Sequence, residues 1–167
     1  GFKAHFKAAK KVDLYPYSIS SPNIQIKKIS NNLIKYTNPI EAIKNFQGGI
    51  ISIATKPKVQ SNILDYILKN INNLNITGIM LEKPISNSFK RSKQLILILN
   101  KRRIPYLINF IFTKLFLMKK FKHLLKNKKI NEIQYIWKFR QAYYINKIKT
   151  WKTNPKSGGG LINYYLI

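Results

Sequence analysis

The amino-acid sequence predicts an α/β protein built on a doubly wound parallel sheet. Residues 50–54 and 76–81 are short apolar runs rich in branched side chains, which is the pattern of buried strands. Residues 58–70 lie between them and are amphipathic over the length of a helix. The apolar face of that helix carries Val59, Ile63, Ile67 and Leu68. Two strands separated by a helix of this length are typical of a parallel pair with a crossover connection.

The N-terminal third is expected to add one helix and further strands. Residues 1–11 are read as a loop entering a short helix whose buried face includes Phe6 and Ala9. Residues 12–20 fit a strand broken by a proline, and residues 24–29 and 33–36 fit shorter strands.

Two further helices and a final strand are expected in the remainder of this sheet. Asn38 can cap a helix that continues to residue 46, because Pro39 suits its first position. Residues 86–101 predict a longer helix with Ser86 as its cap and an apolar face at Leu95, Ile98 and Leu99. Residues 105–110 fit the last strand of the set.

A domain boundary is expected near residues 110–114, which divides the chain into domains at 1–112 and 113–167. Residues 114–126 predict a basic helix, and residues 130–142 alternate as the first strand of a second sheet. Ser157 can cap a helix that begins in the following glycines and runs to residue 167. The second domain would therefore be the beginning of an α+β domain.

Composition places the chain among globular proteins without defining a partner. Hydrophobic residues make up 45% of it, enough to build a core, and it has no cysteine, which excludes disulfides and cysteine-based metal sites or nucleophiles. This fits a reducing compartment, and we expect a cytoplasmic protein. The longest apolar stretch, residues 106–118, is too short and too polar for a membrane span, so no membrane partner is expected.

The net charge of +26 is interpreted as a by-product of base composition. Lysine, isoleucine and asparagine are over-used together, as a genome poor in G and C would favour. The lysines are dispersed over every predicted element, whereas a nucleic-acid footprint is a clustered face or stripe. We therefore expect no specific nucleic-acid partner.

Three motifs, in order along the chain, carry a resemblance to a known family. The first is Ile53-Ala54-Thr55-Lys56-Pro57, at the end of one predicted strand, and the second is Glu82-Lys83-Pro84, at the end of the next. Both lie at the carboxyl edge of a parallel sheet, where ligands bind. The third is Trp151-Lys152 followed by Ser157 and three glycines. Together they resemble the Gfo/Idh/MocA family of nicotinamide-dependent oxidoreductases.

That resemblance implies a Rossmann-like domain that binds NAD or NADP, here without its first strand. The cofactor-binding residues it implies are Gly1, Ser18, Ala54, Thr55, Pro57, Glu82, Lys83 and Asn109. The choice between NAD and NADP stays open. The predicted strand at residues 12–20 ends in serines. It offers no acidic residue for the ribose and no arginine for a 2′-phosphate.

The implied activity is hydride transfer between NAD(P) and a hydroxyl or carbonyl carbon of a sugar, cyclitol or related small molecule. Lys83 would be the catalytic residue, hydrogen-bonding the reacting oxygen. Trp151, Lys152 and Asn163 would bind substrate, although Trp151 is equally consistent with a core anchor. His5 lies near a histidine position of the family, but a helix-face role is favoured for it, and His123 is expected at the surface.

Both ends are expected to be incomplete at functional motifs, with a general acid/base histidine at or just after residue 167. The fragment alone is expected to be inactive, and the whole protein could form a homo-oligomer through the sheet of its second domain. Two alternatives remain: a nucleic-acid- or polyanion-binding protein on a Rossmann-like scaffold, and the inactive product of a decaying gene.

Overall fold

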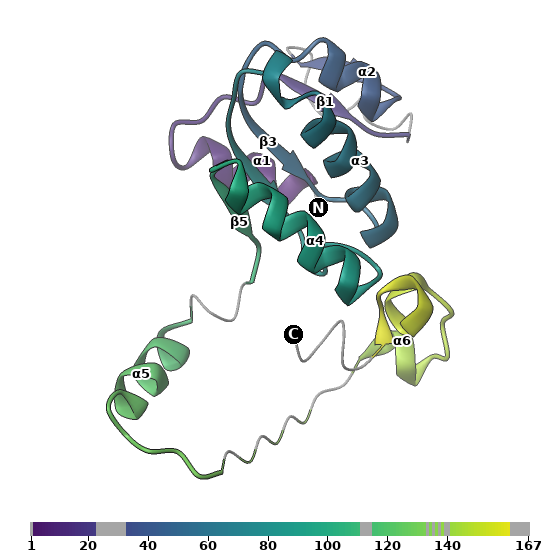
Figure 1. The fold of residues 1–167 in the computed structure, drawn as a ribbon. Coiled ribbons are helices and arrows are strands. Elements are labelled where there is room, and N and C mark those ends of the chain that lie inside the picture. Colours follow the sequence, from purple (N-terminus) through teal and green to yellow (C-terminus); the bar gives the residue numbers. More distant parts are fainter. Residues whose placement is uncertain are drawn as a thin grey trace.

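The fold was analysed in a computed structural model, which describes residues 2–22, 33–110, 115–132, 134, 136, 138 and 141–160. Helices and strands alternate through the first two thirds of the described chain (Figure 1). In order they are α1 (Phe2–Lys10), β1 (Ser18–Ser20), β2 (Ile34–Tyr36), α2 (Pro39–Lys44), β3 (Gly49–Ile53), α3 (Pro57–Lys69), β4 (Ile76–Leu81), α4 (Phe89–Lys101), β5 (Tyr106–Ile108), α5 (Phe116–Leu125) and α6 (Ala142–Ile145). Short 3-10 turns lie at Ile71–Asn73, Trp151–Thr153 and Pro155–Ser157.

The strands form two parallel sheets. One holds β1 beside β2, and the other has the order β3-β4-β5, with Leu81 opposite Ile53 on one side and Ile108 on the other. Within the described residues, no backbone ladder joins β1 to β3. The predicted parallel α/β fold is confirmed.

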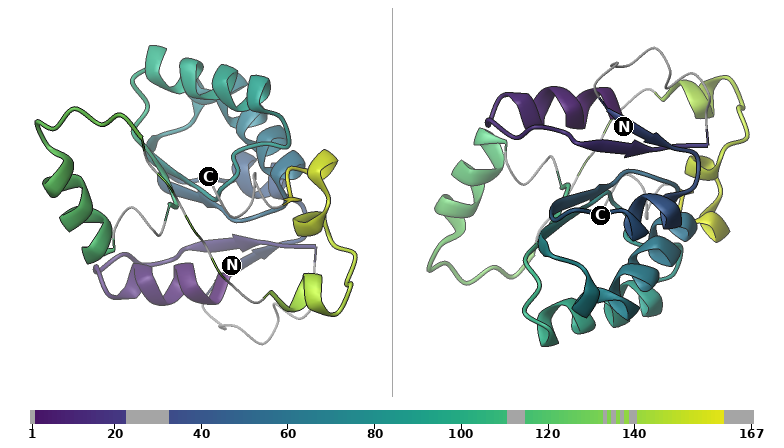
Figure 2. Two further views of the ribbon diagram at one scale, coloured as in Figure 1. Left: turned by 90° about the horizontal axis from the view of Figure 1, so that it is seen from below. Right: turned by 90° about the horizontal axis from the view of Figure 1, so that it is seen from above.

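The helices cover both sides of the strands. Figure 2 shows α1 on one side and α3 and α4 on the other, which is the doubly wound arrangement. Helices α3 and α4 also pack against each other, and an ion pair joins Arg91 of α4 to Asp65 of α3. The largest core cluster draws on α2, β3, α3, β4, the turn after β4, and α4. Its fully buried members include Leu64, Ile67 and Leu95.

The start of α2 and the bounds of β4 agree with the sequence predictions. The Asn38 side chain accepts a hydrogen bond of 2.8 Å from the Ile40 N–H at the start of α2, and Pro39 is its first residue. The predicted strand at residues 76–81 is β4 without change. The predicted strand at 12–20 is reduced to three residues, because the chain first turns after α1 and leaves Leu14 and Tyr17 exposed. The expected strand at 24–29 lies outside the described residues.

Two helix assignments need correction. The cap of α4 is Ser88, whose Oγ accepts from the Arg91 N–H, and not Ser86. Ser86 is buried, and its Oγ instead bonds both the N–H and the carbonyl oxygen of Ser88. In α3, Val59 is 44% exposed and Gln60 is 0% exposed, so the buried face is rotated from the one predicted.

The chain after β5 buries less. Helix α5 forms where the basic helix was predicted, but it buries none of its residues, and Phe116, Leu117 and Leu124 are exposed. The described residues of 130–142 show no strand, contrary to the prediction, and Ala142 begins α6. None of the helices in the described part is long and apolar enough to span a membrane.

The glycine-rich segment contacts the part of the fold built on the β3-β4-β5 sheet. Gly158 adopts a φ of +82°, and a Cβ there would lie 2.9 Å from the Asn87 Cα and 3.3 Å from the Pro57 side chain. Only glycine fits this contact, because the conformation is left-handed and the space is filled. At Gly158 this segment therefore packs against the loop after β4 and the start of α3. The helix predicted beyond it lies outside the described residues.

We predict that the two sheets differ in local stability. Sheet β3-β4-β5 contributes to the core cluster, whereas β1 and β2 contribute no residue to it and pair over three residues each. Amide hydrogen exchange should therefore be at least about a hundredfold slower at Ile79, which donates to the Pro105 carbonyl oxygen, than at Ile34, which donates to that of Tyr17. Equal protection at the two amides would show that the sheets open as one unit.

Candidate active site

Three neighbouring strands bring polar side chains to one edge. Ser52 lies near the end of β3, Glu82 follows β4, and Asn109 follows β5. Because β3, β4 and β5 are parallel, their carboxyl ends meet at the same edge of the sheet. The Asn109 N–H donates to the Leu81 carbonyl oxygen at 2.8 Å, which places its side chain beside that of Glu82.

The Glu82 carboxylate is the centre of this group. Its Oε1 accepts from Asn109 Nδ2 at 2.8 Å and lies 2.8 Å from His5 Nε2. A carboxylate only accepts, so His5 Nε2 carries the proton of that bond. The other ring nitrogen, Nδ1, lies 2.6 Å from Ser52 Oγ. His5 therefore links α1 to the ends of β3 and β4, which lie far from it in the sequence.

The backbone of the same turn is bonded by Gln60 of α3. Its Oε1 accepts from the Glu82 N–H at 2.9 Å, and its Nε2 donates to the carbonyl oxygen of Glu82 at 2.7 Å. The same Nε2 lies 3.2 Å from the carbonyl oxygens of both Pro84 and Ile85. The polar groups of the turn are thus satisfied away from water, as buried backbone requires.

Lys83 lies within this turn, and its peptide bond to Pro84 is cis. The side chain is half-buried. Burial lowers the pKa of Lys83 below the ordinary lysine value, and the neighbouring Glu82 carboxylate opposes that shift to a smaller extent. A lysine with a lowered pKa at a sheet edge can donate a hydrogen bond as the cation and accept a proton as the neutral amine.

The other predicted residues are placed with less contact to this group. Ala54 and Thr55 are exposed between β3 and α3, and Pro57 is the buried first residue of α3. Ser18 is in β1, on the far side of the split between the sheets. Gly1 and Asn163 lie outside the described residues.

Trp151 and Lys152 begin the 3-10 turn that precedes the glycines. The Lys152 Nζ lies 5.1 Å from the centre of the Tyr143 ring, a distance typical of a cation–π contact. A Cβ on Gly159 would be 2.0 Å from the Trp151 carbonyl oxygen, so this glycine is what allows the turn to close. The Gly158 contact with Pro57 brings the segment to the carboxyl side of the β3-β4-β5 sheet.

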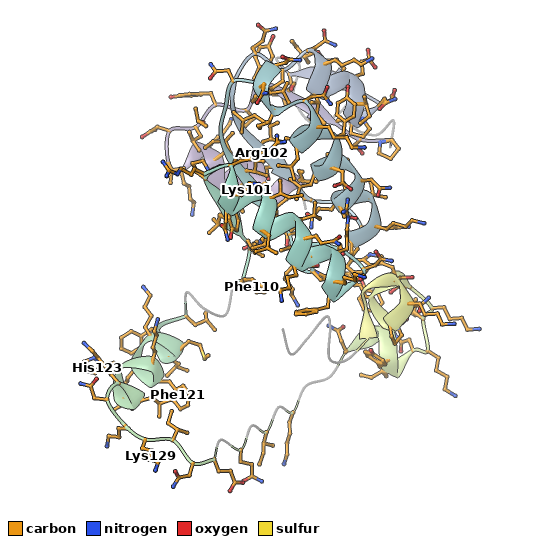
Figure 3. All side chains as sticks on the ribbon, in the orientation of Figure 1. Lys101, Arg102, Phe110, Phe121, His123 and Lys129 are labelled. Atoms are coloured by element: carbon orange, nitrogen blue, oxygen red, sulfur yellow. The ribbon has the colours of Figure 1, made fainter. Side chains whose placement is uncertain are left out.

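A helix-face role was expected for His5 and a surface position for His123, and the structure places the two differently. His123 is exposed on α5, away from the strands (Figure 3). His5 is not a simple helix-face residue, since it contacts Glu82 and Ser52. Sequence reasoning also missed Gln60. A signal for it existed, because the buried positions 60, 63, 64, 67 and 68 follow a regular helical spacing.

No protein-family model and no curated protein matches the chain. Solved structures do match. The WlbA dehydrogenase from Bordetella pertussis, in complex with NADH and UDP-GlcNAcA, has a TM-score of 0.74 at 13% identity, covering 98% of this chain and 53% of that one. The WlbA (WbpB) dehydrogenase from Thermus thermophilus, with NAD and UDP-GlcNAcA, has 0.69 at 15%, covering 96% and 54%. The transcriptional regulator Gal80p from Kluyveromyces lactis has 0.62 at 16%, covering 72% and 32%.

These matches define a fold class: the chain has the Rossmann-like fold of these dehydrogenases and of this regulator. The resemblance to Gfo/Idh/MocA-type proteins that the motifs indicated is thereby confirmed at the level of the fold. The chain spans about half or less of the length of these structures. Since one fold supports enzymes and a regulator alike, the activity has to be argued from the site.

We predict that the His5 contact stabilises the folded chain. His5→Ala removes one of the partners of a part-buried carboxylate and should lower the free energy of unfolding by about 1–3 kcal/mol. Lys7→Ala, at an exposed position of the same helix, is the matched control and should change it by under about 0.5 kcal/mol. Urea unfolding of both variants measures the difference, and equal effects would contradict the role given to His5.

Proposed function

We propose that this chain belongs to an NAD(P)-dependent oxidoreductase of the Gfo/Idh/MocA type, which transfers a hydride to or from a hydroxyl or carbonyl carbon of a sugar, cyclitol or related molecule. The observation that carries the proposal is Lys83, half-buried with a lowered pKa in a turn fixed at the carboxyl edge of the sheet. The solved dehydrogenases of this fold, described in complex with NAD or NADH and UDP-GlcNAcA, support it.

The described residues fit a dinucleotide on chemical grounds. Ser20 ends β1, and its Oγ is buried without a hydrogen-bond partner among the described residues. The end of this strand is where a Rossmann-type fold places the group that holds the ribose. Ser18 of the same strand and the residues Ala54, Thr55, Pro57, Glu82, Lys83 and Asn109 would hold the remainder. When bound, the cofactor supplies or accepts the hydride.

The chain's own residues would position the substrate and its proton. The Lys83 ammonium hydrogen-bonds the reacting oxygen and stabilises the negative charge that develops on it. Glu82 accepts from His5 and Asn109 through Oε1, and these two bonds would hold its carboxylate against the turn. Trp151, Lys152 and Asn163 would contact the substrate from the second domain, residues 113–167, which would also provide any oligomer interface.

We predict that Lys83→Ala, in the complete protein, lowers kcat by about a hundredfold or more while the protein stays folded and melts cooperatively. The reason is that removal of the donor leaves the developing charge on the substrate oxygen without stabilisation. Lys101→Ala, at the exposed end of α4 (Figure 3), is the control and should leave turnover unaffected. The measurement is NAD(P)H absorbance with a panel of sugar derivatives. Wild-type turnover by Lys83→Ala would remove the catalytic assignment.

A second candidate function is polyanion binding, which the net charge of +26 favours. The lysines are dispersed, however, and the described elements include none of the usual DNA-reading modules.

For this alternative we predict weak, sequence-independent association with nucleic acid. It should disappear steeply between about 50 and 200 mM salt, because binding by dispersed lysines is driven by counterion release. Fluorescence anisotropy with two unrelated oligonucleotides at both salt concentrations measures it. Sequence-specific binding that survives the higher concentration would make polyanion binding the primary function.

A further inference from the structure

Gln60 contributes no group to the chemistry proposed above, yet its side chain is 0% exposed and directed at the turn that carries Lys83. A buried primary amide offers two N–H donors and a carbonyl acceptor, and each has to be satisfied locally. In Gln60 these groups are satisfied by the backbone of that turn. The side chain of Gln60 therefore satisfies backbone groups of this turn, just as pairing with β3 and β5 satisfies the backbone groups of β4.

The atoms that Gln60 bonds lie on both sides of Lys83. Before it are the N–H and carbonyl oxygen of Glu82, at 2.9 and 2.7 Å. After it are the carbonyl oxygens of Pro84 and Ile85, each at 3.2 Å. Because the backbone is held before and after Lys83, the direction in which its side chain leaves the turn is held as well.

Other contacts hold the turn at its two ends, since the Glu82 carboxylate bonds His5 and Asn109 and Ile85 belongs to the core cluster. The Glu82 N–H also reaches the Ile53 carbonyl oxygen, but at 3.3 Å. Without the amide, the carbonyl oxygens of Pro84 and Ile85 would lose a buried donor, and the turn would gain by moving toward water. That movement would take Lys83 with it.

We propose that Gln60 is a positioning residue: its amide fixes the Glu82–Ile85 backbone and so sets the direction and burial of the Lys83 side chain. Its importance for turnover rests on the function proposed above, whereas its hold on the turn does not. The experiment is therefore chosen to read Lys83 directly, without cofactor or substrate.

The test compares the full chain with Gln60→Met and Ser61→Ala by competitive acetylation of lysines across a range of pH, read by mass spectrometry. Gln60→Met keeps the length of the side chain and removes the amide. Ser61 is the adjacent buried polar residue, and its hydroxyl bonds the Lys58 carbonyl oxygen within α3, so Ser61→Ala is a matched control. Exposed Lys101 is the internal reference for reagent access.

In Gln60→Met we expect the labelling rate of Lys83, relative to Lys101, to rise by about tenfold, since a released side chain is freely reached by reagent. Its apparent pKa should rise toward the ordinary value of 10.5, because desolvation is relieved. Ser61→Ala should resemble the unaltered chain. Unchanged labelling in Gln60→Met, or an equal change in both variants, would overturn the proposal.

If Gln60→Met does not fold, the unaltered chain still provides a test. The side-chain amide protons of Gln60 should exchange with solvent at least about tenfold more slowly than those of exposed Gln94. Equal exchange would overturn the proposal. An NAD(P)H titration of the complete protein separates the two hypotheses: a Lys83 response without cofactor binding by the complete protein would support the role of Gln60 and contradict the oxidoreductase.

Discussion

The turn after β4 has to provide hydrogen-bond partners for a part-buried carboxylate and several backbone groups, and the surrounding structure is arranged around that requirement. Partners come from α1 through His5, from α3 through Gln60 and from the end of β5 through Asn109. Helix α3, which delivers Gln60, lies in the core cluster, and β5, which precedes Asn109, packs against it. An unpartnered buried polar group costs about 1–3 kcal/mol, so the helices and strands that supply these partners are coupled through the turn as well as through apolar contact.

Apolar packing is distributed unevenly around this turn. The core cluster includes Ile53, Leu81 and Ile85, which flank the turn from both strands and from its own end. Strands β1 and β2 lie outside the cluster and beyond the split. Contact between α1 and the sheet edge is therefore made by a polar side chain, His5, and not by a shared ladder. In this way α1 reaches the carboxyl edge of the β3-β4-β5 sheet, although β1 and β2 lie outside the core cluster.

Local signals predicted the elements well and the polar network poorly. Asn38 with Pro39 marks a helix start through interactions within a few residues, so one sequence is enough to find it. The partner of His5 lies 77 residues away, and nothing near His5 indicates it. Gln60 was passed over because a hydrophobic face was assigned by residue type, which favours Val59. In the structure the polar residue is inside because it has backbone partners there, and that information is tertiary.

The burial of Lys83 lowers the stability of the folded chain and also lowers the pKa of its amine. Because its pKa is lowered in the folded chain, the folded state binds fewer protons than the unfolded state between the lowered value and the ordinary value of 10.5. Stability attributable to this group therefore rises with pH through that window and is reduced at lower pH, where Lys83 is charged in both states. A solvent-exposed lysine would avoid the cost, but it would also lose the lowered pKa and the fixed direction. Desolvation alone would favour movement of the charged Lys83 side chain into water. The bonds from Gln60 to the flanking backbone oppose that movement and so offset the cost.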